Sequence, residues 1–206
     1  MGNIKKLPTE LANQIAAGEV VERPASAVKE LVENALDAGA KRVAIFIEFG
    51  GKRSIRVEDD GTGMSGDDVA LAFDRHATSK LRNFKDLTSI STLGFRGEAL
   101  PSIASVSKVM LRTRVEGMPH GTEICIEGGI TQSKRQVGMP QGTAITVEDL
   151  FYNVPARRKF LKSDGAETSQ ISRLVNQIAL GYPEVGFALT SRGKPVLQCP
   201  PVNNLR

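Results

Sequence analysis

The stretch "ELVENALDAGA", residues 30–40, ends an amphipathic helix and places two polar side chains one turn apart on it. The helix is predicted to begin at Pro24, because proline suits a first helical turn, and to run to about Ala38. The glycine that follows is a favoured helix stop. Its apolar residues repeat at helical spacing and form one stripe: Val28, Leu31, Val32, Ala35 and Leu36.

Glu30 and Asn34 are the two polar residues, and their directions around the helix axis differ by about 40°. Both lie off the apolar stripe, so they are predicted to face a crevice between the helix and whatever covers it. A carboxylate in such a crevice can accept a proton from water, and an amide oxygen can bind magnesium. Taken alone, the pair is more simply explained as part of a solvated polar face.

The composition is that of an ordinary soluble globular protein, with 206 residues of which 40% are hydrophobic and 24% charged. No apolar run approaches the roughly 18 residues of a membrane span, and the first ten residues lack the apolar segment of a secretory signal. Cys125 and Cys199 stand far apart, which favours a reduced cytoplasmic protein, or a nuclear one in a eukaryote, with no membrane partner. The net charge of +4 is compatible with a polyanionic partner, and the basic run 156–162 is either a solvated surface or a DNA contact.

Helical and strand patterns mix without regular βαβ alternation, so the sequence predicts an α+β fold built as a layered sandwich. Strands are predicted at 43–49 and 54–58, joined as a hairpin at Gly50-Gly51, at 109–114, 123–127 and 144–147, and as a last hairpin at 187–191 and 195–198. Helices are predicted within 7–20 and at 67–73, 99–104 and 169–180. Residues 1–199 are expected to form one domain, with 200–206 as the start of a linker to a following domain.

Four further motifs could carry chemistry, although each is weak by itself. "EDDGTGM", residues 58–64, ends a strand with acids that can accept a hydrogen bond from an amine, yet Asp-Gly is also a common turn pair. "STLGFRGEAL", residues 91–100, offers free backbone N–H groups for phosphate oxygens. "RHATSK", residues 75–80, adds a hydroxyl and a cation, and "GTAITV", residues 142–147, places Thr143 on a strand.

Together with "ELVENALDAGA" and "PARRKF", residues 155–160, these motifs closely resemble the N-terminal ATPase region of the MutL family of DNA mismatch-repair proteins. The resemblance extends over essentially the whole chain. It implies the Bergerat nucleotide-binding fold, shared with type II topoisomerase ATPase domains, Hsp90 and sensor histidine kinases. That fold is a layered α/β sandwich in which helices cover one face of a mixed sheet, and its ligands are ATP and magnesium.

The same resemblance assigns roles to individual residues. Glu30 would be the general base that activates water, and Asn34 would hold magnesium against the phosphates. Asp59 would recognise the adenine amine, with Thr143 supporting it through water and Gly63 making room near the base. The phosphate side would be lined by Thr78, Ser79, Lys80, Gly94, Phe95, Arg96, Gly97, Glu98, Ala99 and Leu100.

Two residues depart from the family pattern. Asp60 stands where the family often has asparagine, and Pro101 follows the phosphate-binding stretch where alanine or serine is common. Pro101 is expected in the first turns of a helix, where its missing N–H matters least, so its effect should be small.

The function implied is an ATP-binding, slowly hydrolysing switch domain in mismatch repair. Residues 75–107 have little periodicity and carry several expected phosphate contacts, so they are expected to order as a lid when triphosphate binds. Ordering of the lid would favour a homodimer or MutL-type heterodimer through residues 7–22, and the other implied partners are a MutS-type mismatch recognition protein and DNA.

Three alternatives remain open: a topoisomerase or chaperone ATPase, a histidine kinase, and a nucleotide-binding module unable to hydrolyse ATP by itself. A histidine kinase would need a phosphoacceptor domain, which these residues do not contain. The binding module remains open because the family takes a phosphate-contacting lysine from the following domain. Weak or no hydrolysis by these 206 residues alone is therefore expected.

Overall fold

The computed structural model describes residues 8, 17–75, 77 and 97–202. These residues form an eight-stranded sheet with the strand order β5-β4-β3-β6-β2-β1-β7-β8. The strands are β1 (Arg42–Glu48), β2 (Ser54–Asp59), β3 (Lys108–Arg114), β4 (Gly121–Glu127), β5 (Ile130–Val137), β6 (Gly142–Glu148), β7 (Gly186–Ser191) and β8 (Lys194–Cys199). β1 and β7 pair parallel, whereas the other neighbours pair antiparallel, so the sheet is mixed.

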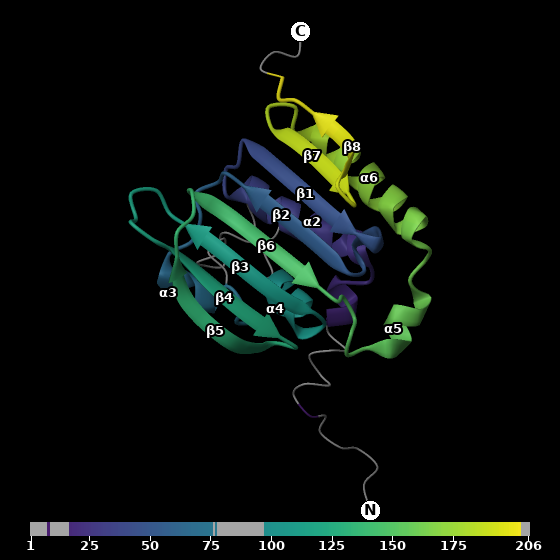
Figure 1. Cartoon of the computed structure of the whole chain (residues 1–206), viewed down its shortest axis with the longest axis horizontal. Helices are drawn as coiled ribbons and strands as arrows, with labels where there is room; N and C mark the ends of the chain where they lie inside the picture. Colours follow the sequence, from purple (N-terminus) through teal and green to yellow (C-terminus); the bar gives the residue numbers. More distant parts are fainter. Residues whose placement is uncertain (1–7, 9–16, 76, 78–96, 203–206) are drawn as a thin grey trace, which may run out of the picture.

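The helices cover one face of this sheet, which confirms the predicted α+β sandwich. They are α2 (Pro24–Asp37), α3 (Gly66–Leu71), α4 (Ala99–Ser105) and α6 (Asp164–Gly181), whereas α5 (Pro155–Phe160) lies beside the sheet. The short 3-10 turn η1 (Phe49–Gly51) lies between β1 and β2. In Figure 1, α2 and α4 lie behind the sheet, and the opposite face of the sheet is turned toward the viewer. Within the described ranges, none of the helices is both long enough and apolar enough to cross a membrane.

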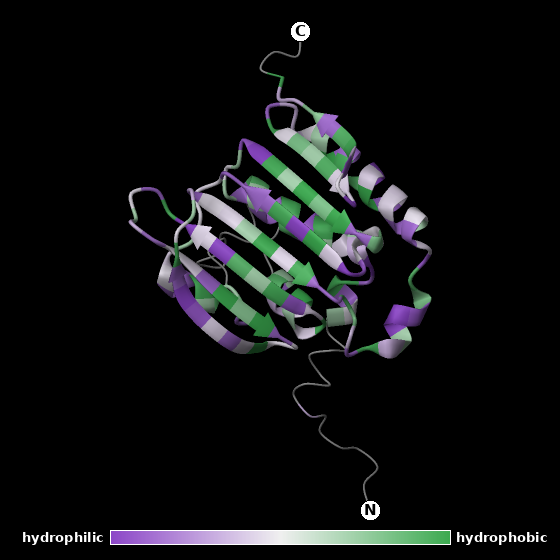
Figure 2. Ribbon diagram, in the orientation of Figure 1, coloured by the Kyte–Doolittle hydropathy of each residue, from purple (hydrophilic) through white to green (hydrophobic). Residues whose placement is uncertain are grey.

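The core lies between the sheet and the helices, because every second residue of a strand faces the helices. Figure 2 shows the alternation of apolar and polar residues most clearly along β2. In β1, Val43, Ile45 and Ile47 are buried toward the helices, whereas the residues between them point to the open face. The predicted apolar stripe of α2 packs against this layer, and its members Val28, Leu31, Val32 and Ala35 are buried. Burial of this stripe leaves the side of α2 that carries Glu30 and Asn34 half-buried at its border.

Most predicted elements are confirmed within a few residues at each end. The strands at 109–114, 123–127 and 144–147 and both hairpins are present, and the helices at 67–73 and 99–104 correspond to α3 and α4. Of the helix predicted within 7–20, residues 17–20 are helical, and the rest apart from Pro8 lies outside the described residues.

β5 and α5 were missed because neither has a buried face. β5 is one of the two edge strands of the sheet, and all of its side chains except that of Val137 are exposed, so no apolar alternation marks it. α5 contains no buried residue, so the basic run that it contains has no amphipathic period. Periodicity predicts an element only where one side of it is covered.

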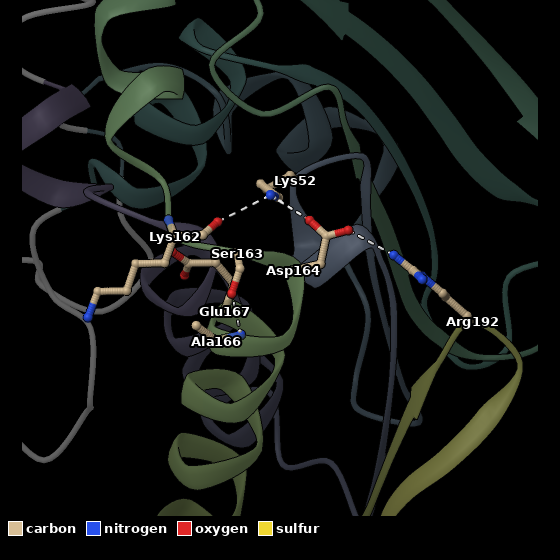
Figure 3. A network of polar contacts seen from close by, with 7 residues as sticks. All are labelled: Lys52, Lys162, Ser163, Asp164, Ala166, Glu167 and Arg192. Carbon is tan, nitrogen blue, oxygen red and sulfur yellow. Dashed lines mark hydrogen bonds and ion pairs between the residues drawn. The ribbon is translucent and has the colours of Figure 1, made fainter.

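α6 begins at Asp164, five residues before the predicted start at Ser169, and Figure 3 shows why. The Ser163 hydroxyl accepts a hydrogen bond from a backbone N–H in the first turn of the helix at 3.4 Å. The Asp164 carboxylate pairs with Lys52 at 2.5 Å and with Arg192 at 2.8 Å. Lys52, above all, and Arg192 lower the pKa of Asp164. The second residue of the helix, Gly165, has low helix propensity. The contacts of Asp164 with distant residues therefore help to fix the start of the helix.

Candidate functional site

Asp59, the last residue of β2, lies between two neighbouring strands on the helix-covered side of the sheet. In the sheet register it stands opposite Val43 of β1 and Thr143 of β6. Side chains directly opposite on adjacent antiparallel strands share one face and lie close together. Asp59 and Thr143, which belong to separate sequence motifs, are therefore neighbours in the structure.

The Asp59 carboxylate is partly removed from water. Burial, the largest influence, and the neighbouring Asp60 carboxylate raise the pKa of Asp59 from 3.8 to about 6, against the opposing effect of backbone hydrogen bonds from Gly61 and Thr143. The Gly61 N–H donates to Oδ1 at 2.9 Å. A carboxylate has about four lone-pair positions, so this group can still accept hydrogen bonds, and an amine donor would stabilise its ionised form.

Asp60, the adjacent acid, binds the backbone at the start of β1. Its Oδ1 accepts hydrogen bonds from the backbone N–H groups of Lys41 at 2.7 Å and Arg42 at 2.8 Å. Its second oxygen lies 3.6 Å from Nε of Arg42. Asp60 thus fixes the start of β1, and the single side-chain oxygen of asparagine could accept the same two backbone bonds. The departure from the family pattern at this position is therefore structurally mild.

The turn that follows β2 packs closely between α2 and β3 because it contains glycine. The Thr62 N–H donates to the carbonyl of Ala38, just beyond α2, at 3.0 Å. A Cβ on Gly61 would come within 2.8 Å of that same oxygen. Gly63 has φ +72°, and a Cβ there would lie 2.2 Å from the carbonyl oxygen of Arg114. Packing within the protein requires both glycines, independently of any ligand.

α2 carries Glu30 and Asn34 one turn apart, as predicted, and both side chains are half-buried. Lys29 Nζ lies 3.8 Å from Oε1 of Glu30 and 3.1 Å from Oε1 of Glu33. The backbone carbonyl of Asn34 accepts a hydrogen bond from the N–H of Ala38 at 3.0 Å. The turn at residues 60–63, called the glycine turn below, contacts Ala38. The end of α2 that carries Asn34 therefore adjoins the turn that follows Asp59.

The motifs at 75–80 and 91–100 meet at Gly97, which has φ +62°. A Cβ on Gly97 would lie 2.5 Å from the carbonyl oxygen of Ala77. Glu98 precedes α4, which begins Ala99-Leu100-Pro101, so the proline stands in the first turn as predicted, where its nitrogen needs no helical partner. Six predicted phosphate-side residues lie outside the described residues: Thr78, Ser79, Lys80, Gly94, Phe95 and Arg96.

Thr113 of β3 is a residue at this site that sequence reasoning missed. It is fully buried and stands opposite Thr143 in the register of β3 and β6. Its Oγ1 lies 2.8 Å from the N–H nitrogen of Met64, 3.1 Å from the carbonyl oxygen of Gly142 and 3.0 Å from Oγ1 of Thr143. A hydroxyl at an inward-facing position of a strand whose other inward-facing residues are apolar is the signal that could have found it.

The chemistry of these groups suits a ligand that places an amino group at Asp59 and a cation with oxygen ligands near α2. A partly desolvated acid beside a threonine hydroxyl can receive an amino group. On α2, a carboxylate can orient water, and an amide oxygen is a ligand type that magnesium accepts. The glycine turn joins these two parts of the site.

Comparisons with known proteins agree with this geometry. The family model described as histidine kinase-, DNA gyrase B-, and HSP90-like ATPase matches residues 22–149. The DNA mismatch repair protein MutL of Koribacter versatilis is 57% identical over 202 residues, which cover 98% of this chain and 31% of that protein. MutL of Solibacter usitatus is 56% identical over 206 residues, which cover 100% of this chain and 31% of that protein. The chain thus spans about a third of the length of these relatives.

A solved structure, the Aquifex aeolicus MutL ATPase domain complexed with ADP, superposes with a TM-score of 0.71 at 40% identity. The match covers 89% of this chain and 66% of that one. These similarities confirm the resemblance to MutL that the motifs predicted. Since the family model spans the α2 pair, the Asp59 turn and Thr143, the chain belongs to the histidine kinase-, DNA gyrase B- and HSP90-like ATPase family.

Proposed function

We propose that the chain is the ATP-binding and slowly hydrolysing switch domain of a MutL-type DNA mismatch-repair protein. The observation that carries this proposal is the Asp59 carboxylate, partly buried beside Thr143 at the start of a glycine turn that docks on the helix of Glu30 and Asn34. Accepting a hydrogen bond from the adenine amine would compensate the desolvation of this acid. The ADP bound to the similar Aquifex domain supports the choice of ligand.

Glu30 and Asn34 on α2 have separate roles in this proposal. Asn34 holds magnesium through its amide oxygen, and the ion, when bound, neutralises charge on the phosphates. Glu30 orients a water molecule and accepts its proton. The spacing of one helical turn, about 5.4 Å along the axis, sets the two functions side by side without overlap.

The other expectations concern the whole protein and remain proposals. ATP binding would order residues 75–107 as a lid and favour dimerisation through residues 7–22, and a lysine from a following domain would complete the phosphate contacts. A MutS-type protein would be the mismatch-recognising partner. Phosphoryl transfer to water depends mainly on positioning and charge neutralisation, so a chain without that lysine should bind ATP well but turn it over slowly.

Turnover by the Glu30→Ala variant tests the proposal. In the protein lengthened by the following domain, we expect ATP binding close to that of the parent and hydrolysis reduced by roughly 10²-fold or more, the scale of losing a general base. Glu33→Ala is the matched control, because Glu33 lies on the same helix and also pairs with Lys29. This variant should hydrolyse ATP normally. Equal turnover by the Glu30 variant and the parent would remove Glu30 from the mechanism.

DNA is proposed as a further partner through α5. Arg158, Lys159 and Phe160 are exposed, and the Phe160 side chain is 86% accessible. Arg157 is different, because its guanidinium donates to the carbonyl of Val21 at 3.2 Å and packs on Gly18. Reversing the charge of Arg158 and Lys159 together should weaken DNA binding. The slope of the logarithm of the binding constant against the logarithm of the salt concentration should become shallower by about two. If α5 does not contact DNA, the affinity and the slope should both stay unchanged.

A further inference from the structure

We propose that Thr113 fixes the hydroxyl proton of Thr143 and thereby makes the base pocket selective for an amino group over a carbonyl oxygen. The inference rests on the proposed function, because the ligand concerned is a nucleotide base. Thr113 acts through Thr143, so it is a positioning residue. It connects β3, the start of β6 and the glycine turn at one point.

The proton assignment follows from the three contacts of the Thr113 hydroxyl. A hydroxyl has one hydrogen and two lone pairs. The N–H of Met64 can only donate, so it occupies one lone pair, and the carbonyl of Gly142 can only accept, so it takes the hydrogen. The second lone pair then faces Oγ1 of Thr143 at 3.0 Å, and Thr143 must donate. With this arrangement each of the three contacts is a hydrogen bond.

The reverse arrangement is unfavourable. If Thr113 donated to Thr143, its oxygen and the carbonyl oxygen of Gly142 would stand 3.1 Å apart with no hydrogen between them. Thr113 is 0% exposed, so water has no access to compensate for such a contact. Facing lone pairs of two buried oxygens repel each other, which favours the first arrangement.

The consequence for the pocket is that Thr143 presents only lone pairs to a ligand. Its single hydrogen is directed to Thr113, and the neighbouring Asp59, when ionised, is also an acceptor only. Two acceptors side by side favour direct contact with an amino group, which has two hydrogens. They disfavour a base that presents a carbonyl oxygen at the same position. Discrimination therefore depends on Thr113, which has no contact with the base in this scheme.

The test is the ratio of affinities for ATP and inosine triphosphate, whose base has a carbonyl oxygen in place of the amine. Thr113→Val keeps the shape of the side chain and removes the hydroxyl, so the Thr143 hydroxyl is free to donate into the pocket. We expect the ATP preference measured by calorimetry to fall about tenfold, the effect of one hydrogen-bond reversal. Thr113→Ser restores the hydroxyl and should keep the parental ratio within about twofold.

Thr146→Val is the matched control, because Thr146 lies on β6, the strand of Thr143, with its side chain on the open face of the sheet. Its ratio should not change. Thr113→Val also leaves the N–H of Met64 without its acceptor, so the measurements are made well below the unfolding temperature of each variant. Equal weakening of both nucleotides, or an unchanged ratio in the valine variant, would overturn the inference. A parent chain that binds neither nucleotide would instead overturn the proposed function, and the inference with it.

Discussion

Replacing Asp59 by asparagine should stabilise the nucleotide-free protein and at the same time impair nucleotide binding. Burial is the main cause of the rise in the pKa of Asp59 from 3.8 to about 6, so the folded state holds the ionised carboxylate at a cost. Asparagine has a similar shape, keeps an oxygen for the Gly61 N–H and carries no charge. The cost of ionisation in the folded state is therefore absent from the variant.

The direction and size of the pH effect follow from linkage. A carboxyl whose pKa is higher in the folded state than in the unfolded state binds protons more tightly when folded, so stability falls as pH rises from about 4 to about 6 and is then constant. At 1.36 kcal/mol for each pH unit, a rise from 3.8 to about 6 amounts to about 3 kcal/mol at pH 8 and to almost nothing below pH 4.

Urea unfolding followed by circular dichroism at several pH values between 4 and 8 measures this difference. We expect Asp59→Asn to exceed the parent by up to about 3 kcal/mol at pH 8 and to match it at pH 4. Glu116→Gln removes one negative charge from an exposed loop and is the control for the change in net charge. Parallel stability profiles of parent and Asp59→Asn across this range would refute the reasoning.

Nucleotide binding should change in the opposite direction. A hydrogen bond to a charged group contributes about 1.5–3 kcal/mol, so Asp59→Asn should weaken ATP binding about 10- to 100-fold at pH 8. Because the adenine amine prefers the ionised acid, ATP affinity of the parent should also decrease as pH falls below about 6. Affinity of the variant should not show this decrease, and calorimetry at pH 5 and pH 8 compares the two.

Two further predictions concern the metal and the glycine turn. Asn34→Ala should weaken ATP binding in the presence of magnesium but leave binding without magnesium unchanged. The Asp59 variant should lose affinity in both conditions. If calorimetry shows the same loss for both variants, the two residues do not have separate roles. Gly63→Ala should lower the free energy of unfolding by about 3 kcal/mol or more, since it combines positive φ with a Cβ 2.2 Å from a backbone oxygen. Gly117→Ala, with φ +76° and no atom within 4 Å of its Cβ, should lose only about 1 kcal/mol in the same urea experiment, and equal losses would contradict the packing argument.

Much of the site was predictable because it depends on local geometry. The angle between Glu30 and Asn34 is a property of the α-helix, so the sequence alone sets them one turn apart. The turn at 60–63 could be predicted from its glycines, and Thr143 could be placed on a strand from the pattern around it. The helix start at Asp164 was predicted too late, because Gly165 weakens the local signal of the Ser163 cap. Lys52 and Arg192, distant in sequence, pair with Asp164 there.

The exposed elements mark a second limit of sequence reasoning. Apolar periodicity reports burial, so it revealed the strands with one covered face and gave no sign of β5 at the sheet edge or of α5 on the surface. The basic residues of α5 were noticed only as a run of charge. The structure further distinguishes them, since Arg157 holds the backbone of Val21 while Arg158 is exposed.

The sequence by itself determined the α+β class, the helix that carries Glu30 and Asn34, and the acid followed by a glycine turn, because short-range geometry and burial patterns specify each of them. Only the tertiary structure decided that β2, β6 and β3 lie side by side and so bring Asp59, Thr143 and Thr113 into one row. Burial, above all, raises the pKa of Asp59, and the proposed direction of the Thr143 proton follows from the contact of Thr143 with Thr113 in that row. Burial by distant segments and the pairing of strands remote in sequence create both properties, and no local pattern of residues contains them.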